Sequence, residues 1–252
     1  MALEERRERI VDLVNAEGSV SFSQLKKAFP SVSEMTLRTD LKALDEARRI
    51  VRVHGGAKSV RFAVGTDDLF ARRVTRSASS KHRIALKAVD MLRPDTVVFM
   101  DSGSTTTAMA SVMPDIHLLV FTNSVTVASE LARLERVETM LIGGRLNRQS
   151  MCTSGGTAIE RVSSLSFDQS FIGVTGYERE RGFSCGLDDE AVLKRTVIAR
   201  SDERIVLMDS SKEGRHSTFP FGTLAQIDAV VSDDGLSQEF LMDCSAAQTR
   251  II

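Results

Sequence analysis

The sequence predicts an α/β protein with an N-terminal winged helix-turn-helix followed by a larger Rossmann-like domain. Near the N-terminus, helical patterns of apolar residues are separated by a tight turn and followed by a strand that ends in Gly-Gly. Farther along, short apolar strands alternate with amphipathic helices, as in a parallel sheet covered on both faces. We expect the two domains at residues 1–58 and 81–252, joined by a basic linker at 59–80.

Charge separates the two parts as well. The chain of 252 residues has a net charge of −1, yet residues 1–83 carry 17 Lys and Arg against 11 Asp and Glu, whereas the remaining residues carry 16 against 23. A basic head on an acidic body is typical of proteins whose head binds a polyanion. On charge alone, basic residues that merely coat a linker are the alternative.

Composition indicates a soluble cytoplasmic protein. No apolar run approaches the roughly 20 residues of a membrane span, so we expect no membrane association. The stretch "MALEERRERI" is charged and has no apolar signal-peptide core. Cys152, Cys185 and Cys244 are too scattered for a zinc site or a CxxC redox pair, so we expect reduced thiols. The sequence predicts neither a bound metal nor a cofactor.

The first helix is predicted over "LEERRERIVDLVNAEG". Leu3, Ile10, Leu13 and Val14 fall on one helical stripe, and Gly18 is a natural stop. A short extended piece, "SVSF", and a two-turn helix, "SQLKKAF", follow. These elements form the first half of the predicted helix-turn-helix.

A tight turn leads to the next helix, "EMTLRTDLKALDEA". Pro30 interrupts the preceding helix, and Ser33 can cap the new one. The apolar residues expected to face inward are Met35, Leu37, Leu41 and Leu44. The polar residues left to face outward are Thr36, Arg38, Thr39 and Lys42. Two short helices joined by a tight turn, the second cationic on its outer face, are typical of a helix-turn-helix.

The strand "RIVRVHGGA" predicts a wing directly after this helix. Arg52 and His54 alternate with Val51 and Val53, and the Gly-Gly pair can form a hairpin turn. A small helical cap with a basic surface is the alternative, but the turn and the wing together favour DNA binding. The candidate DNA-contacting residues are Ser33, Thr36, Arg38, Thr39, Lys42, Arg52 and His54.

The rest of the chain alternates between strands and helices. The predicted strands are "TVVFMD", "HLLVFTNS", "VETMLIGG", "FDQSFIGVTG", "RIVLMDSS" and "AQIDAVVSDD". The predicted helices are "HRIALKAVDML", "STTTAMASVM", "VTVASELARL", "TAIERVSSL" and "DEAVLKRTVIARS". In sheets of this kind, ligands bind beyond the carboxyl ends of the strands.

Polar and glycine residues gather at those strand ends. After the first strand, Gly103 lets a backbone approach an anion, and the following hydroxyls and helix N-terminus favour phosphate. Lys212 supplies a positive charge from another strand end, so the set fits a phosphorylated sugar. An ordinary strand-to-helix turn is the alternative for any single loop, and nucleotide motifs are absent from the sequence. The candidate effector-binding residues are Asp101, Gly103, Ser104, Thr105, Thr106, Thr122, Asn123, Gly143, Gly144, Glu190 and Lys212.

The pattern "SxxTLRxDLxxLDE…IVRVHGGA", from Ser33 to Ala57, resembles the N-terminal signature of DeoR-type bacterial transcription regulators. The chain departs from that signature at Thr39, where a second Arg is usual, and at Arg48, where a Gly is usual. Thr39 removes one candidate phosphate or guanine contact, so the operator sequence of relatives does not transfer. Because Arg48 replaces the glycine whose left-handed conformation usually ends this helix, the sequence does not fix the residue at which the helix ends.

The resemblance extends over the larger domain. In order, "KHRIA", "DSGSTTTAMA", "TNSVTVASEL", "IGG", "FDQSFIG" and "DSSK" resemble the effector domain of DeoR-type regulators. That domain is similar in fold to ribose-5-phosphate isomerase. The resemblance implies a repressor of a carbohydrate operon, released from operator DNA by a phosphorylated sugar and assembled as a dimer or tetramer.

An isomerase with an accessory DNA-binding head is the alternative function. An aldose–ketose isomerase needs a carboxylate base and a partner for the oxyanion. The isomerase carries "DGADE" where this chain has "GVTGYERE", with glycine and threonine in place of the acids. Glu190 alone is weak support for catalysis, so we expect a regulator without enzymatic activity.

Overall fold

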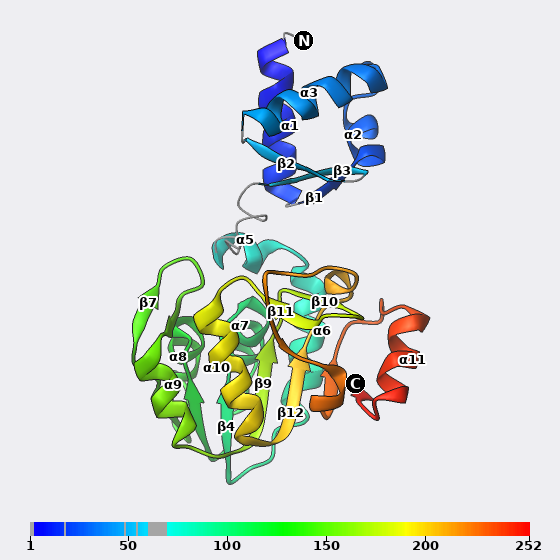
Figure 1. The fold of residues 1–252 in the computed structure, drawn as a ribbon. Helices are drawn as coiled ribbons and strands as arrows, with labels where there is room; N and C mark the ends of the chain where they lie inside the picture. Colours follow the sequence, from blue (N-terminus) through cyan, green and yellow to red (C-terminus); the bar gives the residue numbers. More distant parts are fainter. Residues whose placement is uncertain (1–2, 18, 48, 54, 60–69) are drawn as a thin grey trace. The chain divides into compact units, whose positions relative to one another are not determined.

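The computed structural model describes residues 3–17, 19–47, 49–53, 55–59 and 70–252 (Figure 1). The chain divides into two compact units, Met1–Asp68 and Leu69–Ile252, which we call the head unit and the sensor unit. Each is an independently packed body with its own hydrophobic core.

The head unit combines three helices with a small antiparallel sheet. Its elements in chain order are α1 (Leu3–Glu17), β1 (Ser19–Ser21), α2 (Phe22–Ala28), α3 (Glu34–Glu46), β2 (Ile50–Val53) and β3 (Gly56–Ser59). The sheet has the order β1-β3-β2, so "SVSF" supplies a strand beside the wing hairpin. Helix, turn, helix and wing are therefore confirmed as predicted.

Local hydrogen bonds explain where the helices of the head unit begin. Ser21 and Gln24 form a reciprocal capping box at the start of α2. The hydroxyl of Ser33 accepts the backbone N–H of Thr36 at 3.1 Å, as expected for the cap of α3. At its other end, α3 closes at Ala47; Arg48 lies outside the described residues.

The core of the head unit corrects one predicted position. Leu37, Leu41 and Leu44 are buried as expected. Met35 is 81% exposed, because at 100° per residue it lies about 160° from Leu37, on the opposite face of α3. The prediction that Met35 faces inward is therefore wrong. Leu3, on the same helical stripe as the buried Ile10 and Val14, is exposed in the first turn of α1.

The sensor unit is built on a parallel sheet of seven strands in the order β15-β14-β12-β9-β4-β5-β6. The strands of this sheet are β4 (Thr96–Met100), β5 (Leu118–Thr122), β6 (Val137–Leu141), β9 (Phe167–Gly173), β12 (Ser201–Leu207), β14 (Ala229–Val231) and β15 (Arg250–Ile251). The helices are α5 (Phe70–Thr75), α6 (Ala78–Val89), α7 (Ser104–Ser111), α8 (Val125–Leu131), α9 (Gly156–Ser163), α10 (Asp188–Ala199) and α11 (Gln238–Ala246), with short 3-10 turns η1 (Ser210–Lys212) and η2 (Leu224–Gln226).

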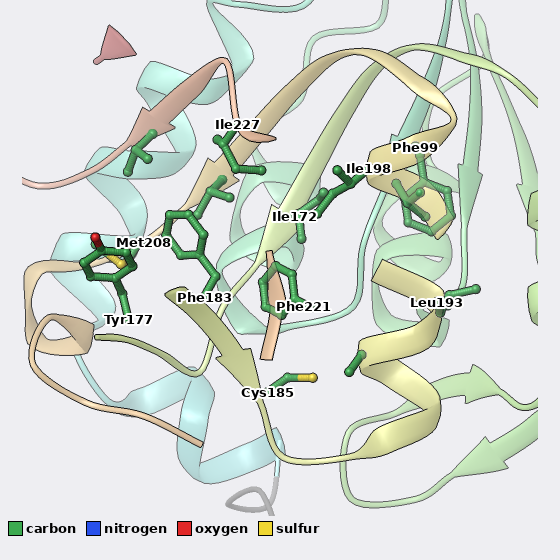
Figure 2. Packing of buried hydrophobic residues seen from close by; sticks show 14 of the residues in the cluster. Phe99, Ile172, Tyr177, Phe183, Cys185, Leu193, Ile198, Met208, Phe221 and Ile227 are labelled. Carbon is green, nitrogen blue, oxygen red and sulfur yellow. The ribbon is translucent and has the colours of Figure 1, made fainter. Parts of the chain in front are cut away.

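Helices cover both faces of this sheet, as the continuous apolar strands predicted. One face packs Val98 and Met100 of β4 against residues such as Ile84 and Met109 of α6 and α7. The other face packs Phe99 and the buried residues of α9 and α10 into a second cluster, part of which Figure 2 shows. Because alternate residues of β4 enter opposite cores, the strand is buried on both sides.

Several small elements were not predicted. They are the edge strand β15 of the large sheet, the hairpin β7 (Arg145–Asn147) with β8 (Cys152–Ser154), the sheet of β10 (Gly176–Glu178), β11 (Gly182–Cys185) and β13 (Phe219–Gly222), and helices α5 and α11. Within the expected linker 59–80, residues 60–69 lie outside the described residues, while 70–75 form α5 and α6 begins at Ala78.

Candidate functional site

The outer face of α3 carries the candidate DNA-contacting cations. Arg38 and Lys42 have side chains that are 60% and 68% exposed. The guanidinium of Arg38 lies 4.7 Å from the ring centroid of Phe22 and 3.9 Å from the carboxylate of Glu34. Exposed ion pairs of this kind contribute little, typically below about 1 kcal/mol, so a phosphate can replace the carboxylate at small cost.

The hydroxyl residues of α3 have local partners. Ser33 and Thr36 bond to each other through their side-chain oxygens at 2.8 Å, in addition to the cap. Thr39 donates its hydroxyl to the backbone carbonyl of Met35 at 2.9 Å. Ser33 and Thr36 therefore stabilise the start of α3, while the hydroxyl of Thr39 is engaged by its own helix, and any contact with DNA would come in addition to these roles.

The wing is a tight β2–β3 hairpin. Gly55 has φ +82°, a conformation that favours glycine, and a Cβ on Gly56 would lie 2.1 Å from the backbone oxygen of Val20. Arg52 is exposed, and its backbone N–H donates to Asp45 at 2.9 Å, which ties the wing to α3. His54, the remaining candidate, lies outside the described residues.

In the sensor unit, Asp101 follows β4 and is paired with a residue that the sequence analysis missed. Lys194 of α10 donates to the carboxylate of Asp101 and, at 3.0 Å, to the backbone oxygen of Gly173. Both side chains are buried, and Gly173 N–H also donates to Asp101 at 2.9 Å. Burial, the largest single effect, lowers the pKa of Lys194, but the charge and hydrogen bond of Asp101 together with Cys185 and Glu190 outweigh it, so the pKa is raised overall.

Glu190 is buried one helical turn before Lys194 and holds the β7–β8 hairpin. Its carboxylate accepts the hydroxyl of Ser150 at 2.7 Å and the thiol of Cys152 at 3.2 Å. Burial and the neighbouring charge of Glu190 raise the pKa of Cys152 to about 12, so this thiol stays protonated. Two charged residues four apart on the apolar face of α10 were the sequence signal for this buried network.

The loop after β4 presents a helix N-terminus. Gly103 has φ +144° and precedes α7, whose first N–H groups have no partner within the helix. Thr106 is fully buried and donates to the backbone oxygen of Gly103 at 2.9 Å, so it stabilises the loop. Ser104 and Thr105 are half-exposed at the start of the helix, where they can reach an anion.

The next strand ends carry Thr122, Asn123, Gly143 and Gly144. Thr122 accepts the N–H of Ser124 at 3.0 Å and is buried, so its hydroxyl is occupied by the turn. Asn123 donates its amide to a backbone oxygen at 3.2 Å, but its buried side-chain oxygen has no partner among the described residues. A Cβ on Gly144 would lie 2.7 Å from the backbone oxygen of Ser154, whereas Gly143 is unobstructed.

A second missed residue, Lys81, lies in the first turn of α6 beside the turn that carries Lys212. It is only 5% exposed and donates to the backbone oxygens of Arg73 and, at 2.6 Å, Arg76. Burial and the nearby charges of Lys212, Arg73 and Arg76 lower the pKa of Lys81 to about 8, against the opposing effect of Asp209. A buried ammonium at a helix N-terminus, among other cations, is an unfavourable arrangement that an anion would relieve.

Two family models of known proteins match this chain, one in the head unit and one in the sensor unit. A family model described as the DeoR-like helix-turn-helix domain matches residues 6–62, and one described as the DeoR C terminal sensor domain matches residues 76–234. The chain belongs to the DeoR family of transcriptional regulators.

Two relatives of this DeoR-family chain are named as repressors. The chain is 32% identical to the "Putative aga operon transcriptional repressor" of Escherichia coli O157:H7, over 98% of this chain and 93% of the relative. It is 30% identical to the "Glycerol-3-phosphate regulon repressor" of Escherichia coli strain K12, over 91% and 90%. Ribose 5-phosphate isomerase A from Methanocaldococcus jannaschii aligns with 53% of each chain at 16% identity and a TM-score of 0.39. That likeness carries no conclusion about chemistry.

The geometry of this DeoR-family chain therefore separates candidate residues that have structural roles from the remaining candidates. Asp101 and Glu190 are buried in structural networks, and Thr106 and Thr122 stabilise turns. Of the other groups, Ser104 and Thr105 are half-exposed, the side-chain oxygen of Asn123 has no partner among the described residues, and Lys212 lies in the η1 turn near Lys81. Among the described residues, no helix is long and apolar enough to cross a membrane, and no cluster of His, Cys, Asp or Glu could hold a metal.

Proposed function

We propose that the protein represses a carbohydrate operon and that a phosphorylated sugar in the sensor unit changes its affinity for operator DNA. The observation that carries the proposal is the buried ammonium of Lys81, whose pKa is lowered by burial and by three nearby cations against one acid, Asp209. The strand ends of the same unit add hydroxyls and the side-chain oxygen of Asn123, which has no partner among the described residues. The names of its repressor relatives, one of them for the glycerol-3-phosphate regulon, support the same class of ligand.

In the head unit, α3 would lie in the major groove, with Arg38 and Lys42 on phosphates or base edges and Arg52 of the wing on the backbone. Assembly as a dimer or tetramer would present two such helices to half-sites about one helical turn apart. Because its partner is operator DNA, we infer that the protein acts in the cytoplasm.

In the sensor unit, the phosphate would lie at the N-terminus of α7, near Ser104 and Thr105, with its charge balanced by Lys212 and Lys81. The amide oxygen of Asn123 could accept a sugar hydroxyl, and Gly143 leaves room for the ring. A neutral sugar would bring no negative charge to Lys81 and Lys212, so the site should favour the phosphorylated form.

Catalysis is not part of the proposal. An isomerase needs a carboxylate that can take a proton from the sugar. Asp101 is paired with Lys194, and Glu190 is engaged by Ser150 and Cys152, so both acids already have buried partners. These contacts support binding without turnover.

Lys81 also offers a route from ligand to DNA. Its ammonium holds the backbone oxygens of Arg73 and Arg76 at the end of α5 and just beyond it, and α5 is the first helix of the sensor unit after the head unit in the chain. A phosphate that draws this ammonium away would weaken those bonds. The ligand would then favour a different state of α5 and, through it, a state of the protein with lower DNA affinity.

A thermal-shift screen tests this proposal. The panel contains glycerol 3-phosphate, pentose and hexose phosphates, and each unphosphorylated counterpart, against the full chain and the Lys212→Ala variant. At least one phosphate ester should raise the melting temperature of the wild type, its neutral counterpart should not, and the variant should lose the shift. Equal shifts from the neutral sugars, or an undiminished shift in the variant, would contradict the proposal.

A further inference from the structure

One large apolar side chain stands on the outer face of α3. Met35 is 81% exposed, more than any other large hydrophobic residue that the structure describes. It is the second residue of the helix, at the end where the recognition helix of a helix-turn-helix contacts base edges. An apolar group this exposed gains nothing from the fold of the head unit.

Met35 also lies in the middle of the exposed stripe of α3. At 100° per residue, Met35, Thr39, Lys42 and Glu46 fall within about 60° of one another around the helix axis. Arg38 lies beside this stripe, stacked over Phe22. Cations that can contact phosphates therefore flank an apolar group that cannot.

The polar groups around Met35 already have partners. Thr39 donates to the backbone oxygen of Met35, and Ser33 and Thr36 bond to each other. Arg38 and Lys42 lie 3.9 and 3.8 Å from Glu34 and Glu46. The thioether of Met35 is the group on this face whose burial would add an apolar contact and displace no hydrogen bond.

We propose that Met35 reads thymine in the operator by packing its side chain against the C5-methyl group in the major groove. That methyl group is the apolar feature that distinguishes thymine from the other bases in this groove, and apolar side chains recognise it by contact. The inference rests on the proposed role of α3 as the DNA-reading helix. It assigns base recognition to a residue that the sequence predicted to lie in the core.

Deoxyuridine tests the contact, because it removes only the methyl group. A duplex is first selected from a random-sequence library with the full-length wild-type chain, and each thymine is then replaced in turn by deoxyuridine. For the wild type, one or a few replacements should weaken binding about 4-fold each, the effect expected for the loss of one buried methyl contact. Met35→Ala should bind the thymine duplex about as weakly as the wild type binds the deoxyuridine duplex, and should no longer distinguish the two.

Met242→Ala is the matched control, since Met242 is 64% exposed on α11 of the sensor unit and should leave every affinity unchanged. Circular dichroism of Met35→Ala should match the wild type, because an exposed Met→Ala change in a helix removes no packing. A Met35→Ala variant that keeps wild-type affinity, or that loses the same affinity on every sequence and stays sensitive to deoxyuridine, would overturn the inference. Failure of the wild type to select any duplex would instead overturn the proposed role of α3 as well.

Discussion

The buried pair of Asp101 and Lys194 allows a quantitative test of the sensor unit. Both side chains are almost fully buried, and Lys194 otherwise has the backbone oxygen of Gly173 as its hydrogen-bond acceptor. Asp101→Asn keeps the shape of the side chain but removes the carboxylate that pairs directly with the ammonium. Removing one partner of such a pair costs about 3–5 kcal/mol of unfolding free energy. At roughly 2–4 °C per kcal/mol for a unit of this size, the melting temperature should fall by about 6–20 °C.

The fluorescence of Tyr177 is a suitable probe for this experiment. The chain has one tyrosine and no tryptophan, and Tyr177 is buried in the core of the sensor unit, so the signal reports that unit alone (Figure 2). Adding Lys194→Met to Asp101→Asn should restore most of the stability, because it removes the buried ammonium that lost its carboxylate partner.

Asp189→Asn is the matched control for the same substitution at the surface. Asp189 pairs with Arg145 at 2.9 Å, but their side chains are 41% and 80% exposed, so its loss should cost less than about 1 kcal/mol. If Asp101→Asn destabilised the sensor unit no more than Asp189→Asn, the buried pair would not have the structural role described here. Asp101 would then again be a candidate residue for direct contact with the effector.

Three further predictions concern the two proposed binding surfaces. Lys42→Ala should weaken DNA binding and lower the slope of log affinity against log salt by about one, and an unchanged slope would exclude a phosphate contact. Arg52→Ala should weaken binding to many sequences alike, since a backbone contact carries no base preference; a loss confined to one base pair in a competition assay would contradict this. The pKa of Lys81 is lowered to about 8, below its ordinary 10.5, so part of the protein carries a neutral Lys81 near pH 8. A phosphate ester favours the charged ammonium, so the protein should take up protons when the ester binds near pH 8, and binding should weaken as the pH rises above 8. Calorimetry in two buffers of different ionisation enthalpy measures that uptake, and Lys81→Met should abolish it.

Periodicity predicted the large elements because their burial follows local spacing. Leu37, Leu41 and Leu44 share one face of α3 by their positions alone, and the apolar strands of the parallel sheet are continuous in the sequence. The apolar character of Met35 predicts an inward position, but its phase on the helix places it opposite Leu37, on the exposed face.

The pairings at the strand ends could not be predicted in the same way. Lys194 meets Asp101 across 93 positions of sequence, and Lys81 acquires its surroundings from α5 and the η1 turn. The strands β10 and β11 have three or four residues and contain glycine, so they show too little alternation to be read from sequence. Short elements and long-range charge pairs therefore mark the limit of the sequence analysis.

Release of DNA by a sugar phosphate is the measurement that decides whether this DeoR-family chain is a sensor. The selected duplex is bound to the wild type and to the Ser104→Ala, Thr105→Ala double variant, and the phosphate ester found by thermal shift is titrated into both. The wild type should release the duplex, and the variant should bind the duplex with wild-type affinity yet need a much higher ligand concentration to release it. Aldose–ketose conversion is followed in the same samples and should be absent. Conversion of the sugar phosphate, with duplex affinity unchanged at every ligand concentration, would contradict the regulator and support the isomerase instead.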